Sequence, residues 1–459
     1  MLYFRKPIAL CLALAFLLTA SLPGEAAALT IQEEQQLAEE FLQTVRERYK
    51  IIKDPAIADY VDHVGQRVVA ELPQQAFDYH FYVIEQDAYN AFAGPAGHIF
   101  VFSGLLEALS HEGELAALLA HEIAHASCRH ISKMIESSKK TSITTLAGMI
   151  AGILIGLGGA SSVGSAIAVG SMAAGESATL AYTREKEMQA DQIGREYLQQ
   201  AGYDLHSMLS LLKTIRSQEW FDTEQIPTYL RTHPATKDRL TYLATTLSNQ
   251  PAPPRQKNHA FERAQVRLTA LYGNSGKALA HFKEKIQSQP DNPMAHYGYG
   301  LALGQNGNKE AAINHIQKAY SAFPEDPFMA TDLGRLHFQS GSYEKALSLL
   351  QPAERQSAVG PEGMYYLGRT QLALEQTAAA ARTFTDLVEA YPDYLRGLYF
   401  LGKSYAEQND PGQAHYYLGL YHKHRKDREN AAYHFKQALK KLEDPEKKQK
   451  INQLLKNSN

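Results

Sequence analysis

The second half of the chain repeats with an interval of 34 residues, and this period restricts the fold more than any other feature of the sequence. Three kinds of residue keep the interval. Glycines lie at Gly300, Gly334, Gly368 and Gly402, alanines at Ala278, Ala312, Ala346, Ala380 and Ala414, and large apolar residues at Phe282, Ile316, Leu350, Phe384 and Leu418. A unit of this length holds two helices and cannot bury its apolar face alone, so successive units must stack into a helical solenoid.

The interval and its small residues resemble the tetratricopeptide repeat, in which glycine and alanine let the two helices of a unit approach closely. Prolines, which cannot continue a helix, end three of the units, at Pro290, Pro324 and Pro392. The first unit, 259–292, departs from the pattern because Gln265 and Val266 stand where the repeat has leucine and glycine. Only its second helix is therefore expected. Beyond Asp427 we expect a further helix and then a basic capping helix over Pro445–Lys456.

Length and composition indicate more than one globular domain. The 459 residues are too many for one core, and 44% of them are apolar. The 46 basic and 49 acidic side chains give a net charge of -3, so no basic field favours a nucleic-acid partner. The stretch Pro251–Pro254 has the composition of a linker. We therefore expect one domain over 29–250, a linker over 251–258 and an α-helical repeat domain over 259–459.

Residues 1–28 have the pattern of a secretory signal peptide. A basic start, Arg5 and Lys6, precedes an apolar run over Ile8–Leu18 and three alanines that end at Ala28. We expect cleavage after Ala28. The alternative is an uncleaved membrane anchor, although the run is shorter than the ~20 residues that span a bilayer. After cleavage the chain keeps one of its two cysteines, Cys128, and cannot form an internal disulfide.

A helical pattern begins after Ser110, which we expect to be the N-cap, and carries the sequence His121-Glu122-Ile123-Ala124-His125. The two histidines are four residues apart, so a helix places both imidazoles on one face, where one Zn²⁺ ion can bind both. Glu122 can then act as a general base toward water. A charged residue in such an apolar helix is costly unless it has a role.

Catalytic zinc needs a third protein ligand and leaves the fourth position to water. The candidate is Glu187, in a second helical segment that ends near Gly202. Asp191 follows Glu187 by four residues and shares its helix face. This spacing suits one ligand and one carboxylate that orients a histidine ring.

These two segments resemble the M48 metallopeptidases, which have an H-E-x-x-H helix and a downstream E-x-x-A-D helix. The resemblance implies one zinc ion per chain bound by His121, His125 and Glu187, with Glu122 as general base and Asp191 supporting a ligand. It also implies an α+β, mostly helical zincin-type domain with a small sheet. Such a domain would hydrolyse peptide bonds.

The combination of signal peptide, M48 domain and repeats resembles periplasmic proteases of Gram-negative bacteria. This resemblance implies a periplasmic location and misfolded or stalled polypeptides as substrates. It also implies outer-membrane assembly machinery as a protein partner of the repeats. The strand expected over 99–102 would offer its edge to an extended substrate, which would bind through main-chain hydrogen bonds.

The sequence Thr232-His233-Pro234 matches a histidine that the family has after the second motif. His233 would either donate to the oxyanion of the tetrahedral intermediate or bind the metal as a fourth ligand in a resting state. The alternative is a surface histidine in a turn before proline. Cys128 is expected to be a packed small residue. Three other histidines near the motif are expected to be partly exposed and away from the metal: His98, His111 and His130.

The apolar, glycine-rich segment 143–175 lies between the two metal-binding helices. One membrane span is excluded because His125 and Glu187 must meet at one ion, and two spans would have too few residues each. We expect a helical hairpin. It would be an ordinary core hairpin, or it would fold over the cleft or rest on a membrane surface as a peripheral contact.

Two other classes of function fit parts of the sequence. In the first, the repeats form a scaffold or chaperone and the zinc domain is latent or inactive. Glu122 argues against this, because a structural zinc site has no use for a base beside its ligand. In the second, the chain is an integral membrane protease, but it lacks enough long apolar segments.

Overall fold

The computed structural model describes residues 29–136, 184–217, 228–233, 237–248, 251, 257–354 and 359–456. The expected signal peptide and the hairpin segment 143–175 lie outside these residues. The chain divides into two compact units, one of Met1–Ile51 and Val64–Pro254 and the other of Ile52–His63 and Arg255–Asn459. Within the described residues, no helix is long and apolar enough to cross a membrane.

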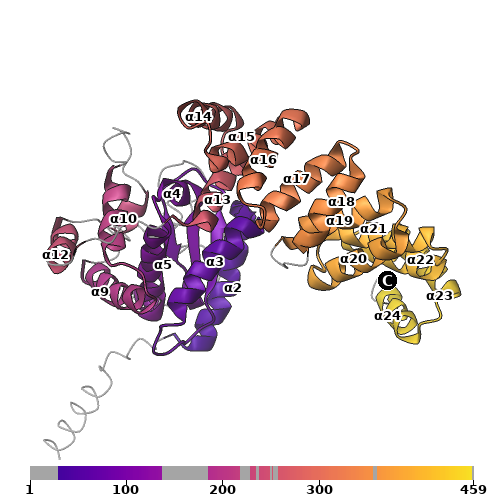
Figure 1. The fold of residues 1–459 in the computed structure, drawn as a ribbon. Coiled ribbons are helices and arrows are strands. Elements are labelled where there is room, and N and C mark those ends of the chain that lie inside the picture. The colour runs from indigo at the N-terminus through magenta and orange to yellow at the C-terminus, as the bar shows by residue number, and fades with distance from the viewer. Residues whose placement is uncertain are drawn as a thin grey trace, which may run out of the picture. The chain divides into compact units, whose positions relative to one another are not determined.

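The first unit combines helices with one small sheet (Figure 1). The elements up to the linker are α2 (Ile31–Arg48), β1 (Ile51–Ile52), α3 (Pro55–Val69), β2 (His80–Ile84), β3 (Ala91–Ala93), a 3-10 turn (Pro95–Gly97), β4 (His98–Phe102), α4 (Ser103–Ala108), α5 (Glu112–Ser127), α6 (His130–Glu136), α9 (Arg184–Gln200), α10 (His206–Ser217), α11 (Thr228–Thr232) and α12 (Lys237–Leu247). The α+β, mostly helical class expected from the sequence is confirmed.

The four strands lie in the order β1-β2-β4-β3. β4 pairs in parallel with β2, where His80 lies opposite His98, and antiparallel with β3, where Ala91 lies opposite Val101. The prediction that 99–102 offers a free edge is therefore wrong, because β4 lies between two strands. The turn that ends at Gly97, which has a φ of 78°, folds the chain back so that β3 becomes the outer strand.

α5 packs against β3 and β4 and carries the H-E-x-x-H motif. Its N-cap is His111, whose imidazole accepts a hydrogen bond from the backbone N–H of Glu114 at 3.3 Å. The prediction of Ser110 as the N-cap is wrong by one residue, since the N–H of Ser110 instead donates to the Glu114 carboxylate at 2.7 Å. Both contacts fix where α5 begins, and so where the motif lies against the sheet.

The core beside α5 is formed by α2 and the sheet. Its fully buried members are mostly aromatic and aliphatic side chains of these elements: Leu37, Phe41, Val45, Ile84, Phe92, Phe100 and Phe102. The Phe41 ring meets the rings of Phe92 and Phe100 edge-on, with centroid distances of 6.2 and 5.8 Å. This packing fixes α2 against the strands on which α5 rests.

The second unit contains a succession of helices in which each packs on the next (Figure 1). They are α13 (His259–Arg267), a π-helical turn (Leu268–Tyr272), α14 (Ser275–Ser288), α15 (Pro293–Gln305), α16 (Lys309–Ala322), α17 (Pro327–Gln339), α18 (Tyr343–Glu354), α19 (Gly360–Ala373), α20 (Thr377–Ala390), α21 (Leu395–Glu407), α22 (Pro411–His424), α23 (Arg428–Lys441) and α24 (Pro445–Lys456). The expected repeat solenoid is confirmed. The first repeat has both of its helices, although the sequence indicated only the second.

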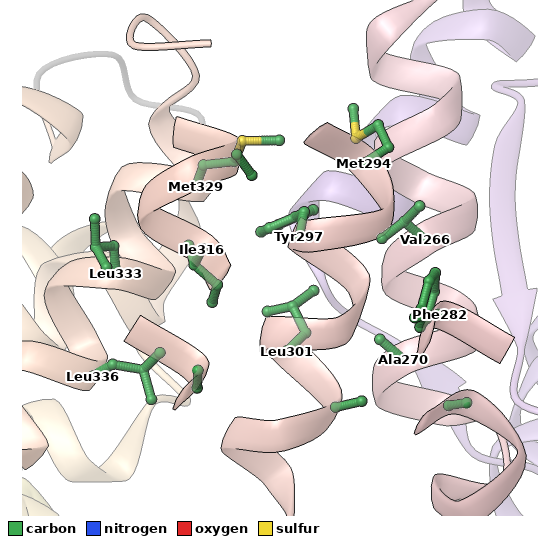
Figure 2. Packing of buried hydrophobic residues seen from close by; sticks show 14 residues of the cluster. Val266, Ala270, Phe282, Met294, Tyr297, Leu301, Ile316, Met329, Leu333 and Leu336 are labelled. Carbon is green, nitrogen blue, oxygen red and sulfur yellow. The ribbon is translucent and has the colours of Figure 1, made fainter. Parts of the chain in front are cut away.

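The glycine, alanine and large apolar positions of the repeat contact one another inside each unit. A Cβ atom on Gly300 would lie 2.6 Å from Cγ1 of Ile316 and 3.0 Å from the carbonyl oxygen of Ala312. Only glycine therefore allows α15 and α16 to approach this closely. The same contact recurs in the next repeats, where Gly334 faces Leu350, Gly368 faces Phe384 and Gly402 faces Leu418. Figure 2 shows part of the resulting core, with Tyr297 and Ile316 among its labelled residues.

Residues 52–63, which the sequence places in the first domain, group with the second unit. Asp54 accepts hydrogen bonds from Nε and Nη2 of Arg267 at 2.9 and 2.7 Å. Asp332 and Tyr297 accept from Nη1 of the same guanidinium. Burial would lower the pKa of Arg267, but Asp332 and Asp54 raise it well above its ordinary value. The charged guanidinium therefore ties the start of α3 to α13, α15 and α17.

We expect Asp54→Asn to lower the free energy of unfolding of the second unit by about 2 kcal/mol, because the buried Arg267 loses a charged partner. The Asn side chain can still accept the hydrogen bond that Asp54 receives from the N–H of Ala56. Asp291→Asn, at an exposed position before α15 in the same unit, is the matched control and should leave stability unchanged. Hydrogen exchange of amides in α13–α17 of the full chain measures both. Equal protection in the two variants would contradict the role given to Asp54.

Candidate metal centre

α5 presents both histidines of its motif on one buried face. His121 is 2% exposed and His125 is 0% exposed, and their Nε2 atoms lie 3.1 Å apart. Burial lowers the pKa of His125 well below its ordinary value. Its imidazole is therefore neutral and can offer a nitrogen lone pair to a metal.

α9 brings Glu187 to the two histidines. Its Oε1 lies 3.3 Å from Nε2 of His125, and its Oε2 lies 3.6 Å from Nε2 of His121. Two ligands at the usual distances from a tetrahedral zinc ion lie about 3.3 to 3.6 Å apart, so the spacing fits. The helices can approach this closely because residue 194 of α9 is glycine. A Cβ atom on Gly194 would lie 2.9 Å from the carbonyl oxygen of Ala120.

His233 follows α11 and joins the same group. It is 0% exposed, and its Nδ1 lies 3.0 Å from Oε1 of Glu187. Its ring stacks on Tyr229, with centroids 4.6 Å apart and planes inclined by 19°. One ligand atom each from His121, His125, Glu187 and His233 lie within 4.8 Å of one another. The structure thus places His233 at the ligand group and not on the surface.

Glu122 lies buried beside this group. It is 0% exposed, and among the described residues neither of its carboxylate oxygens has a hydrogen-bond partner. Its Oε1 lies 3.9 Å from Nε2 of His233. A buried carboxylate without partners is unfavourable unless a ligand or ion completes its surroundings. Imidazole nitrogens and a carboxylate oxygen are ligands that zinc prefers, so the residues present fit a zinc ion.

A buried arginine holds the carboxylates behind the ligands. Arg239 is 3% exposed and donates from Nε and Nη2 to the two oxygens of Asp191, at 2.7 Å each. Its Nη1 donates to Oε2 of Glu187 at 2.5 Å. Burial alone would raise the pKa of Asp191, but Arg239 and His121 keep that pKa below its ordinary value. Asp191 therefore stays ionised at neutral pH.

Asp191 in turn holds the imidazole of His121. Its Oδ1 lies 3.1 Å from Nδ1 of His121. Burial would lower the pKa of His121, but the hydrogen bonds with Asp191 and Glu187 raise it to about 9. A metal that binds through Nε2 at neutral pH must therefore displace a proton. The proton on Nδ1 remains, held by the carboxylate.

Sequence reasoning missed Arg239, and the signal for it is weak. Arg239 begins the buried stripe of α12, which continues with Leu243 and Leu247, four and eight positions later. A charged residue on such a stripe indicates a buried partner of opposite charge. Nothing in the spacing identifies that partner as Asp191, because the two residues meet only in the tertiary fold. Tyr229, which supports the ring of His233, has no sequence signal of its own.

The prediction that His130 is partly exposed is wrong. It is 1% exposed, and its Nδ1 lies 2.9 Å from Nδ1 of His125. The reason is the turn after α5, where Arg129 has a φ of 53° and directs the next residue back toward the helix. His98 on β4 and His111 at the start of α5 are half-buried, as expected, and Cys128 at the end of α5 is half-buried as well and not fully packed.

We expect Arg239→Met to lower the free energy of unfolding of the zinc-free protein by about 3 to 5 kcal/mol, because Glu187 and Asp191 lose their shared cation. Added zinc should recover part of this loss, since it supplies positive charge beside Glu187. Arg184→Met, at the exposed start of α9, is the control and should change neither value. Denaturant unfolding with and without zinc measures both effects. Unchanged stability of Arg239→Met would show that the carboxylates do not need the guanidinium.

Comparison with known proteins gives family matches in both halves of the chain. Residues 55–247 match peptidase family M48, and residues 273–327, 331–394 and 365–414 match the tetratricopeptide repeat. The beta-barrel assembly-enhancing protease of Yersinia pestis is 30% identical over 254 residues, which cover 55% of this chain and 52% of the relative. The protein of the same name from Escherichia coli (strain K12) is 30% identical over 250 residues, 54% of this chain and 50% of the relative.

A more distant relative comes from mitochondria. The mitochondrial metalloendopeptidase OMA1 of Schizosaccharomyces pombe is 28% identical over 189 residues, 39% of this chain and 50% of the relative. The chain thus spans about half the length of the curated relatives that it matches. With the buried His, His, Glu and His group inside the matched region, residues 55–247 form a peptidase family M48 domain, which tetratricopeptide repeats follow in the same chain.

Proposed function

We propose that this chain is a zinc-dependent endopeptidase that hydrolyses peptide bonds in polypeptide substrates. The observation that carries the proposal is Glu122, a buried carboxylate whose oxygens lack hydrogen-bond partners among the described residues. It follows His121 directly and lies beside the group of metal-ligand candidates, with Oε1 3.9 Å from Nε2 of His233. A zinc site with only a structural role needs ligands and no base. The M48 domain match supports the same reaction.

Each residue of the site would have a separate role in hydrolysis. When bound, zinc supplies a Lewis acid that polarises the scissile carbonyl and acidifies water. Glu122 takes a proton from the attacking water and later delivers it to the leaving amine. His121, His125 and Glu187 serve as the ligands. Asp191 supports His121 from behind and keeps its Nε2 directed at the group.

The outer strand β3 is the proposed place for the substrate. β3 ends the sheet and packs against α5, the helix that carries Glu122. An extended polypeptide that adds beside an outer strand binds through its own backbone, so the mode tolerates many sequences. This tolerance suits misfolded or stalled polypeptides.

The repeats would bind the substrate or the machinery that assembles outer-membrane proteins. The names of the bacterial relatives support this class of partner, and stacked repeats offer an extended surface for another protein. The same relatives and the expected signal peptide support a periplasmic location.

A second candidate function is a scaffold or chaperone with a latent zinc domain. The observation that favours it is His233, because four protein side chains then converge, as in closed zinc sites. A reversible fourth ligand reconciles the two candidates. With His233 bound to the metal the enzyme would be inactive. A substrate that binds more tightly to the conformation in which His233 has left the metal would shift the equilibrium toward the active form.

We expect Glu122→Gln to abolish proteolysis while zinc content and folding stay unchanged. The amide has nearly the same shape but cannot accept the proton, and loss of a general base costs about 10²- to 10⁴-fold in rate. Casein hydrolysis and metal analysis of the same preparations measure both. Glu112→Gln, the same change in the first turn of α5, is the control and should keep full activity. Activity retained by Glu122→Gln would overturn the mechanism.

We expect His233→Ala to raise basal casein cleavage or self-cleavage, because it opens the fourth position. His424→Ala, at an exposed position of α22, should leave the rate unchanged. If His233 instead donates to the oxyanion, the variant loses activity, with about 2 to 4 kcal/mol added to the barrier. An unchanged rate would exclude both roles.

A further inference from the structure

A histidine that binds a metal through one ring nitrogen must carry its proton on the other nitrogen. The partner of that second nitrogen therefore decides which tautomer is present. For His121 this partner is the carboxylate of Asp191, 3.1 Å from Nδ1. For His125 the structure shows a different kind of partner at Nδ1, the imidazole of His130 at 2.9 Å.

Contacts of the neighbouring residues in the chain fix the position of His130. It is the first residue of α6 and is 1% exposed. The preceding residue, Arg129, has a left-handed backbone conformation, and its guanidinium Nε donates to the buried carboxylate of Glu34 at 2.7 Å. These contacts fix the turn that returns His130 to the last turn of α5.

The hydrogen bond at Nε2 of His130 determines which ring nitrogen carries the proton. Its Nε2 lies 3.0 Å from Oε1 of Gln189 on α9. A carboxamide oxygen only accepts hydrogen bonds, so in the neutral His130 ring Nε2 carries the proton and Nδ1 is an acceptor. Nδ1 of His125 must then donate, which leaves the lone pair on its Nε2. That atom lies 3.3 Å from Oε1 of Glu187, within the ligand group.

A neutral partner also suits the charge of the site. Glu122, Glu187 and Asp191 contribute three negative charges, and Arg239 with a divalent zinc ion would contribute three positive charges. A second carboxylate behind His125 would leave an uncompensated buried charge, which is unfavourable. The neutral imidazole of His130 accepts the same hydrogen bond and adds no charge.

We propose that His130, oriented by Gln189, is a positioning residue that fixes the tautomer of His125 and thereby sets the metal affinity of the centre. The inference rests on the proposed zinc site but not on proteolysis. His130 touches neither substrate nor reacting atoms in this role. It acts through His125.

The test compares His130→Leu with His130→Asn in the full chain. Leucine removes the acceptor, so zinc should bind about 10- to 100-fold more weakly, as measured by competition with a chelator. Asparagine places a side-chain oxygen near the position of Nδ1 and should keep most of the affinity. His424→Leu, at an exposed position of α22, is the matched control and should bind zinc as the parent does.

A second readout reports the tautomer directly and needs no metal. Long-range ¹H–¹⁵N spectra of the zinc-free protein should show the His125 proton on Nδ1 in the parent and in His130→Asn. In His130→Leu the two tautomers should mix. If the leucine variant does not fold, Gln189→Leu gives the same test, because Gln189 is exposed and its loss frees the His130 ring to reverse its proton.

Two outcomes would overturn the inference. One is parental zinc affinity in His130→Leu, and the other is an Nδ1 proton on His125 that persists in both leucine variants. Zinc binding without casein cleavage in both the parent and His233→Ala would instead contradict the proposed function and leave the role of His130 intact.

Discussion

The close packing of α5 and α9 is the constraint on which the site depends. The two helices supply three of the four ligand candidates, and they approach each other because Gly194 lies against the carbonyl oxygen of Ala120. A side chain at that position would separate the helices, and Glu187 would move away from His125. The carboxylate distances to both histidines, 3.3 and 3.6 Å, thus follow from one residue that has no side chain.

Close packing brings several charges into a buried space. Arg239 forms ion pairs with both Asp191 and Glu187, while Asp191 lies against His121. Glu122 stands apart, because no described residue compensates it by a hydrogen bond. Arg239 and Asp191 thus satisfy each other by hydrogen bonds, and the residue proposed to carry the chemistry is left for a ligand. This contrast separates structural charges from a catalytic one in the same cluster.

Local periodicity predicted much of this molecule, and tertiary contacts account for the rest. The 34-residue interval predicts the repeats because each glycine meets an apolar residue of its own unit, as Gly300 meets Ile316. The spacing of four predicts that His121 and His125 share a face, because helix geometry alone decides it. It cannot predict His130, whose burial depends on the backbone of Arg129, nor Arg239, whose partners lie on another helix. The sequence pattern also could not predict that β4 lies between two other strands, because strand order depends on how the chain folds back.

The ion pair between Asp54 and Arg267 joins residues 213 positions apart within one compact unit. A ribosome adds about 5 to 20 residues per second, so Asp54 is made roughly 10 to 40 s before its partner exists. During that interval Asp54 can accept the hydrogen bond from Ala56 at the start of α3, but Arg267 has not yet been made. The second unit is therefore completed by a segment synthesised long before the rest of it, between the two stretches of chain that form the first unit.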